Sequence, residues 1–176
     1  MSIRSFRSVL SGRRRVVRAG VVFALGVASA ALMGAGTAVA APVTCLSPPS
    51  DNQILVSDTA SCGATATGGG TARASAADSG TAVSVGQTAG AAESQATGFG
   101  TALSSARDGG RSFAFALGGG LSQSWAQGPT TTVSVAGWGS GATVDPTGVR
   151  CAGPQSFAVD MGTGQWCAVG VGSAPR

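Results

Sequence analysis

Small and variable residues alternate strictly along the middle of the chain, and the pattern restarts every ten residues. In each segment the third, fifth and seventh positions are small, as in Ala92, Ser94 and Ala96. A glycine opens six successive segments: Gly70, Gly80, Gly90, Gly100, Gly110 and Gly120. Alternation with period two predicts β-strands, and the fixed interval indicates a repeat architecture. The sequence therefore predicts an all-β fold built from ten-residue Gly/Ala/Ser repeats.

Each segment offers about seven extended residues followed by about three loop residues, such as Ala77-Asp78-Ser79. Seven extended residues span about 23 Å, whereas three loop residues reach back only about 10 Å. A coil with one full-length strand per turn is therefore excluded. Three arrangements stay open: a β-roll or solenoid with two strands per coil of about twenty residues, an antiparallel meander, and a tight ten-residue coil with much shorter strands.

The two sides of the expected strands differ in bulk. One side carries only small residues, which bury little apolar area. The other side has no large apolar residue from Ser57 to Ala82 but is bulky from Leu103 to Val135. We therefore expect the block from Leu103 to Val135 to carry the core. The composition of residues 63–98 is also typical of a disordered linker, but the kept register favours an ordered block.

The flanking segments predict ordinary strands. A short strand is expected at residues 53–57, and a hairpin at residues 156–161 and 165–171 joined by Gly162-Thr163-Gly164. The chain is then divided into a signal peptide at 1–40, an N-terminal disulfide cap at 41–62, a repeat array at 63–141 and a C-terminal disulfide hairpin cap at 142–176.

The first 40 residues have the features of a secretory signal peptide. Six arginines precede an uncharged stretch from Ala19 to Ala40. This stretch ends in the cleavage motif Ala38-Val39-Ala40. Gly12-Arg13-Arg14-Arg15-Val16-Val17-Arg18 also resembles a twin-arginine signal, so the Sec and Tat routes both stay open. We expect a secreted or cell-envelope protein with no membrane span after the signal is removed.

Removal of the signal reverses the net charge. The full chain carries a formal charge of +4, but residues 41–176 hold five arginines against seven acidic residues, a net charge of −2. No basic patch with interleaved aromatic residues remains, so we expect no nucleic-acid partner. A role as an envelope component, or self-association, stays open.

Four cysteines remain after the signal: Cys45, Cys62, Cys151 and Cys167. An even number in an exported chain predicts disulfides. Pairing of Cys45 with Cys62 and of Cys151 with Cys167 is favoured, because each pair is close in sequence and the two pairs flank the array. Each bridge would stabilise the fold by about 3 kcal/mol in the chain-entropy model. We expect the bridges to staple the terminal caps of the array; a four-thiolate zinc site is the alternative.

The residue types needed for catalysis are scarce. The chain has no histidine, lysine or tyrosine, and its seven carboxylates share no face or recurrent spacing. Its serines have no base to activate them. Asp78 and Asp108 fit turn positions. We therefore expect no enzyme activity, no catalytic residues, no cofactor and no metal site.

Phe113, Phe115 and Trp125 are the candidate binding residues. As an exposed group they would contact a glycan, a lipid or a protein, whereas buried aromatic residues of this kind form the core of small β-proteins. We expect the C-terminal hairpin to cover all three, and packing between subunits is the alternative. A recurring threonine column, interrupted in three segments, does not favour an ice-binding surface; its members are Thr71, Thr81, Thr101 and Thr131.

The segments Gly70-Thr71-Ala72-Arg73-Ala74-Ser75-Ala76 and Gly80-Thr81-Ala82-Val83-Ser84-Val85-Gly86 resemble the repeats in head domains of trimeric autotransporter adhesins. That resemblance covers residues 63–136 and implies a parallel β-roll and a trimer; the period here is ten residues, against about fourteen in that family. The export signal, the Gly/Ala-rich middle and the late cysteines also resemble small actinobacterial secreted proteins of unknown function.

The sequence thus predicts a secreted or cell-envelope, non-enzymatic β-rich protein with a structural or binding role. The alternative is a secreted, adhesin-like binder that uses its aromatic residues to contact a glycan, a lipid or a protein.

Overall fold

The computed structural model describes residues 41–170, and the expected signal peptide lies outside them. Fourteen strands and no helix form this part of the chain. Their bounds are β1 Val43–Ser47, β2 Asn52–Val56, β3 Ser61–Thr67, β4 Thr71–Ala77, β5 Thr81–Gln87, β6 Ala91–Thr97, β7 Thr101–Arg107, β8 Arg111–Leu117, β9 Leu121–Gln127, β10 Thr131–Ala136, β11 Gly141–Asp145, β12 Gly148–Ala152, β13 Ser156–Asp160 and β14 Gln165–Val169. Residues 63–98 are thus ordered strands and turns, as the kept register predicts.

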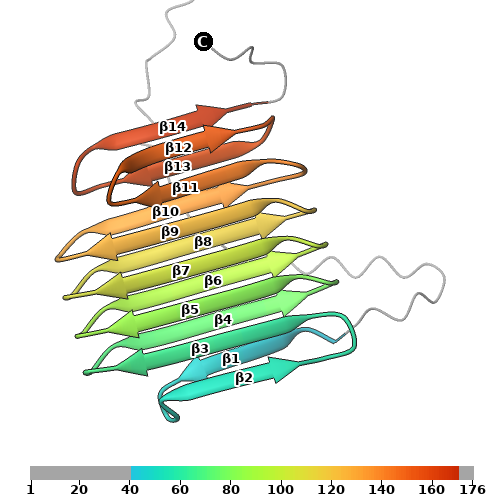
Figure 1. Ribbon diagram of the computed structural model, residues 1–176, viewed down its shortest axis with the longest axis vertical. Coiled ribbons are helices and arrows are strands. Elements are labelled where there is room, and N and C mark those ends of the chain that lie inside the picture. The colour runs from blue at the N-terminus through green and yellow to red at the C-terminus, as the bar shows by residue number, and fades with distance from the viewer. Residues whose placement is uncertain (1–40, 171–176) are drawn as a thin grey trace, which may run out of the picture. The chain divides into compact units, whose positions relative to one another are not determined.

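The strands form a two-sheet β-solenoid (Figure 1). Sheet A has the order β1-β4-β6-β8-β10-β13-β14, and sheet B has the order β12-β11-β9-β7-β5-β3-β2. Successive repeats alternate between the sheets, so each strand pairs in parallel with the strand twenty residues further along, as Thr81 pairs with Thr101. Each coil therefore contains two strands. Of the three arrangements open from sequence, the β-roll is correct, and the meander and the tight ten-residue coil are wrong.

Tight turns, whose central residues have positive φ angles, connect a strand of one sheet to the next strand in the other sheet. In the turn between β4 and β5, Asp78 and Ser79 have φ angles of 49° and 67°. The Gly80 amide then donates to the Ala77 carbonyl oxygen over 2.9 Å. Two consecutive residues with positive φ closed by such a bond make a type I′ turn, which glycine, asparagine and aspartate favour. Asp78 and Asp108 occupy these turns, as expected from sequence.

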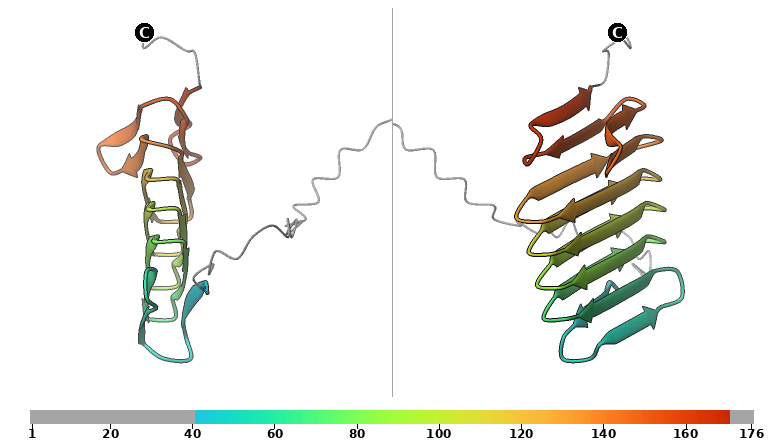
Figure 2. Two further views of the ribbon diagram at one scale, coloured as in Figure 1. Left: turned by 90° about the vertical axis from the view of Figure 1, so that its right-hand side faces the viewer. Right: turned by 60° about the vertical axis from the view of Figure 1, so that its left-hand side comes forward.

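The two sheets lie face to face with a narrow space between them (Figure 2, left). The small residues of the alternating pattern are the buried ones and fill this space. The inward columns of the array are buried from Cys62 to Val144, with Ala74, Ala102 and Ala114 fully so. The expectation that bulky residues from Leu103 to Val135 carry the core is wrong. Leu103 remains 37% exposed on the outside, because the space between the sheets admits only alanine, serine and a few slightly larger side chains.

Buried serine hydroxyls link the two sheets directly. Ser84 Oγ of sheet B donates to the Arg73 carbonyl oxygen of sheet A over 2.6 Å, and Ser112 Oγ donates to the Ser124 carbonyl oxygen over 2.7 Å. Side chains this short reach the opposite backbone only if the sheets lie well below the usual separation of about 10 Å. These hydrogen bonds satisfy polar groups that would otherwise destabilise a dry interior.

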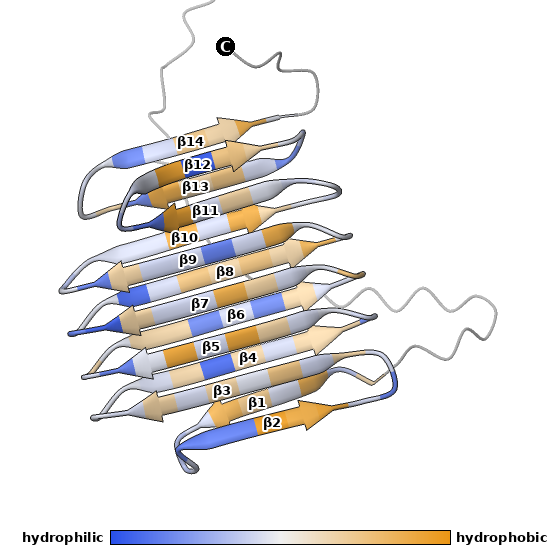
Figure 3. Cartoon of the chain, viewed as in Figure 1, coloured by the Kyte–Doolittle hydropathy of each residue, from blue (hydrophilic) through white to orange (hydrophobic). Residues whose placement is uncertain are grey.

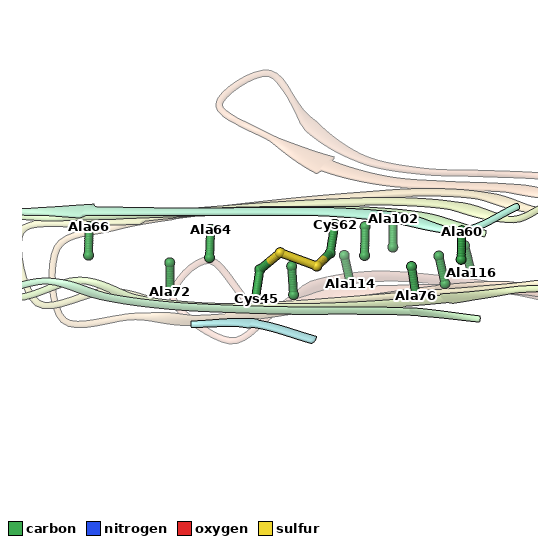
Figure 4. Packing of buried hydrophobic residues seen from close by; sticks show 13 residues of the cluster. Cys45, Ala60, Cys62, Ala64, Ala66, Ala72, Ala76, Ala102, Ala114 and Ala116 are labelled. Carbon is green, nitrogen blue, oxygen red and sulfur yellow. A yellow bond between two sulfur atoms is a disulfide. The ribbon is translucent and has the colours of Figure 1, made fainter. Parts of the chain in front are cut away.

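Antiparallel strands close both ends of the parallel array. At the N-terminal end β1 pairs with β4 and β2 pairs with β3. The disulfide between Cys45 of β1 and Cys62 of β3 crosses from sheet A to sheet B among inward alanines (Figure 4). At the C-terminal end the disulfide between Cys151 and Cys167 joins β12 to β14. Both pairings match the prediction, and each bridge ties one sheet to the other near an end.

The C-terminal hairpin lies where the prediction did not place it. β13 pairs with β10 in sheet A, and β14 pairs with β13. The hairpin therefore extends sheet A edgewise and does not fold over its outer face. Phe113 and Phe115 are consequently not covered by it, because they point outward from sheet A. Trp125 lies on sheet B, where it shares a cleft with residues of the β13–β14 turn.

Candidate functional site

The structure separates the three candidate binding residues. Phe113 and Phe115 lie on the outer face of sheet A, on β8, whereas Trp125 lies on the outer face of sheet B, on β9. All three occupy outward positions of the alternation, but consecutive repeats belong to opposite sheets. A single surface formed by these three residues is therefore excluded. The threonine column is divided in the same way, with Thr71 and Thr131 on sheet A and Thr81 and Thr101 on sheet B.

Phe113 and Phe115 belong to a larger apolar surface. Across the C-terminal half of sheet A, one outward row runs through Phe113, Val133, Val159 and Trp166, and the next row through Phe115, Val135 and Phe157. We call these seven residues the apolar platform. Phe157 is 39% exposed and Trp166 is 67% exposed. Contiguous apolar surfaces of this kind mark interaction sites more often than isolated exposed residues do.

The N-terminal half of the same face is polar. The first row continues from Phe113 to Glu93 and Arg73, and the second from Phe115 to Gln95 and Ser75. Hydropathy accordingly changes along sheet A, from polar in the middle of β4 and β6 to apolar in β8 (Figure 3). One face thus combines a polar part on β4 and β6 with an apolar part on β8, β10, β13 and β14. Beyond the polar part, Leu46 on β1 pairs with Arg73 and is an isolated exposed apolar residue.

Trp125 lines a different feature, a cleft of about 390 Å³ at the C-terminal end of the solenoid. One wall is the β11–β12 turn, which includes Asp145 and Thr147, and the other is the β13–β14 turn, which includes Asp160 and Thr163. The β11–β12 hairpin bends away from its sheet here (Figure 2, left). The sequence does not predict this cleft, because the cleft forms only when two hairpins that are distant from Trp125 in sequence pack together.

An arginine fixes the position of the Trp125 ring. The guanidinium carbon of Arg107 lies 4.9 Å from the ring centroid, within the range of a cation–π contact. Arg107 Nη2 also donates to Gln127 Oε1 over 2.5 Å. The buried Arg107 Nε and Trp125 Nε1 atoms have no hydrogen-bond partner in the described chain.

Hydrogen bonds favour the ionised form of both cleft carboxylates and lower the pKa of each. The Thr147 hydroxyl and amide donate to Asp145 Oδ1 over 2.5 and 2.7 Å, and these bonds lower the pKa of Asp145, with a further contribution from Arg150. Partial burial acts to raise the pKa of Asp160. Donation from the Gly162 amide and from Thr163 and Thr130 outweighs that effect, so the pKa of Asp160 also lies below its ordinary value.

Within residues 41–170, no cluster of three or more histidine, cysteine, aspartate or glutamate side chains is arranged to hold a metal ion. The same part of the chain has no helix with the length and apolarity needed to cross a membrane.

No curated protein and no solved structure gives a match to the sequence. The model of a family of unknown function, DUF6764, matches residues 12–170. Because this match covers most of its length, the chain belongs to the DUF6764 family of unknown function.

Proposed function

We propose that this protein is an exported, non-enzymatic structural module that assembles with a second copy through the outer face of sheet A. The observation that carries the proposal is the apolar platform, which faces away from the solenoid and is not covered by any described segment. The two disulfides support export, because such bonds persist in oxidising compartments. The sheets, linked by buried hydrogen bonds and capped at both ends, supply a rigid surface.

The dimensions of the face fit a contact between copies. Seven strands about 4.8 Å apart and on average about six residues long give the face roughly 650 Å² in plan. A stable interface buries about 800 Å² on each partner. A twofold axis parallel to the stacking direction places the platform against the platform and the polar half against the polar half. Such a self-complementary contact is the usual form of a homodimer interface.

Replacement of two platform residues by their counterparts in the preceding coil of sheet A tests the proposal. Phe113 pairs with Glu93 and Phe115 with Gln95, so the double substitution Phe113→Glu/Phe115→Gln repeats a sequence that this sheet already holds in register. Because burial of each phenylalanine is worth about 1.5–3 kcal/mol, the variant should weaken self-association at least about a hundredfold. Light scattering coupled to size exclusion should show a dimer for the wild type and a monomer for the variant. The melting temperature of the variant should match that of the wild type diluted until it is monomeric.

Val83→Gln/Val85→Ser is the matched control. Both valines lie on the outer face of sheet B, and their rows already contain Gln123 and Ser105. This variant should remain a dimer. A wild-type protein that stays monomeric at high micromolar concentration would contradict the proposal. If the monomer instead floats with phosphatidylcholine vesicles through Phe113 and Phe115, the platform is a lipid-binding surface.

A further inference from the structure

We propose that the cleft between the two C-terminal hairpin turns binds a neutral saccharide. The inference goes beyond the assembly role, because the cleft is lined by residues of both sheets and of the turns, and none of them belongs to the apolar platform. Its volume of about 390 Å³ lies within the range of about 300–1,000 Å³ that is typical of small-molecule sites.

The lining favours a ligand with many hydroxyl groups. Amide side chains, threonine hydroxyls and carboxylates converge on the cleft from five strands and from the segments that connect them, with Trp125 as the aromatic member. Each sugar hydroxyl both donates and accepts, so it matches a mixture of acceptor carboxylates and donor-acceptor amides and hydroxyls. The carbon-bound hydrogens of a sugar ring supply the apolar surface that packs against an indole.

Charge excludes two other ligand classes. The lining contains Asp145 and Asp160 but no basic side chain. The two arginines beside the cleft already have partners in its walls: Arg107 contacts Trp125 and Gln127, and Arg150 contacts Asp145 and Thr147. An anionic ligand would therefore meet two carboxylates and no unpartnered base. Within the described residues, no group of three or more histidine, cysteine, aspartate or glutamate side chains lies here, so a compact metal cation has no ligand set in the cleft. Asp145 Oδ1 and both Asp160 oxygens already accept hydrogen bonds within their turns, and Asp145 Oδ2 lies 4.0 Å from Arg150. A neutral polyhydroxyl ligand requires neither a positive wall nor an unoccupied carboxylate.

The cleft is held open before any ligand binds. The Cys151–Cys167 disulfide fixes β12 to β14 and therefore fixes the spacing of the two hairpins. Gln165 reaches across from β14 towards the other wall, and its Oε1 lies 3.2 Å from the place where a side chain at Gly148 would begin. Thr132, which lines the cleft, is only 2% exposed. Its hydroxyl forms a 2.8 Å hydrogen bond with the Ser124 hydroxyl. Such preorganisation lowers the entropy lost on binding.

Intrinsic fluorescence of Trp125 gives a direct test. The chain has three tryptophans, so Trp138→Phe/Trp166→Phe leaves Trp125 as the only indole reporter. The secreted, oxidised protein, produced from the full-length sequence in this background, is titrated with maltose, cellobiose and diacetylchitobiose. At least one disaccharide should shift the Trp125 emission saturably, with a dissociation constant below about 10 mM. Gln127→Ala/Gln165→Ala should weaken that binding at least about tenfold.

Gln95→Ala/Gln123→Ala makes the same chemical change outside the cleft, on exposed positions of the two outer faces, and should leave binding unchanged. The inference is overturned if no disaccharide in the panel binds, if choline binds more tightly than all three, or if Gln127→Ala/Gln165→Ala binds as well as its parent. The assembly proposal is tested by the molecular mass in solution, so none of these binding results decides it.

Discussion

Gly80→Ala should destabilise the protein by about 3 kcal/mol, although it adds one methyl group. A Cβ atom at Gly80 would lie 2.5 Å from the Ala96 carbonyl oxygen and 2.9 Å from the Ala77 carbonyl oxygen. Both are backbone atoms, so no side-chain rotation relieves the contact, and one coil must move away from the next. Chemical denaturation followed by far-ultraviolet circular dichroism measures the loss.

Gly63→Ala is the matched control for this change. Gly63 lies at an outward position of β3, and a Cβ there would meet only the Val83 methyl groups at 3.9 Å. The same substitution should therefore leave the free energy of unfolding unchanged, or raise it slightly, because alanine restricts the unfolded chain more than glycine does. Equal losses of unfolding free energy at Gly80 and Gly63 would mean that close approach between coils is not the reason why each repeat begins with glycine.

Ala102→Leu should abolish the cooperative unfolding transition or lower stability by more than about 3 kcal/mol. Ala102 is fully buried between the sheets, in the cluster that contains Ala114 and Ala116. Overpacking typically costs about 1–3 kcal/mol where neighbours rearrange. Here the opposite wall is backbone and other alanines, so a leucine must push two hydrogen-bonded sheets apart. Thermal melting of the purified variant measures the effect.

Thr101→Leu places the same side chain one residue earlier on the same strand. Thr101 points outward and pairs with Leu121, so a leucine in this row has a precedent in the next coil of sheet B. Its melting temperature should match that of the wild type. If Thr101→Leu is the damaging change and Ala102→Leu is tolerated, the assignment of inner and outer faces is reversed.

The sequence predicts the strands, the turns and the disulfide pairs because each depends on local spacing. It does not distinguish the β-roll from the meander, because a type I′ turn such as Ala77 to Gly80 also joins two strands of an antiparallel hairpin. The prediction of the core fails for a physical reason. It assumes that the largest side chains are buried, whereas the closely spaced sheets leave room only for residues such as Ala74 and Ser84.

The candidate site shows the same division. Phe113 and Phe115 are recognisable as a pair because they alternate on one strand. Their separation from Trp125 depends on the sheet to which each repeat belongs, which a ten-residue period does not specify. The platform residues Phe157 and Trp166 join β8 only through the edgewise pairing of the hairpin. The cleft requires the packing of two hairpins, which no local pattern encodes.

Proton–proton contacts between strands in the oxidised, isotope-labelled protein test the central arrangement most directly. The two-sheet solenoid predicts nuclear Overhauser effects between strands paired twenty residues apart, such as Val83 with Leu103, and Glu93 with Phe113. It predicts none between Val83 and Glu93, which lie on opposite outer faces. Contacts between successive repeats in an antiparallel register, with none at an interval of twenty residues, would contradict it. The apolar platform and the separation of Trp125 from Phe113 would then be wrong as well.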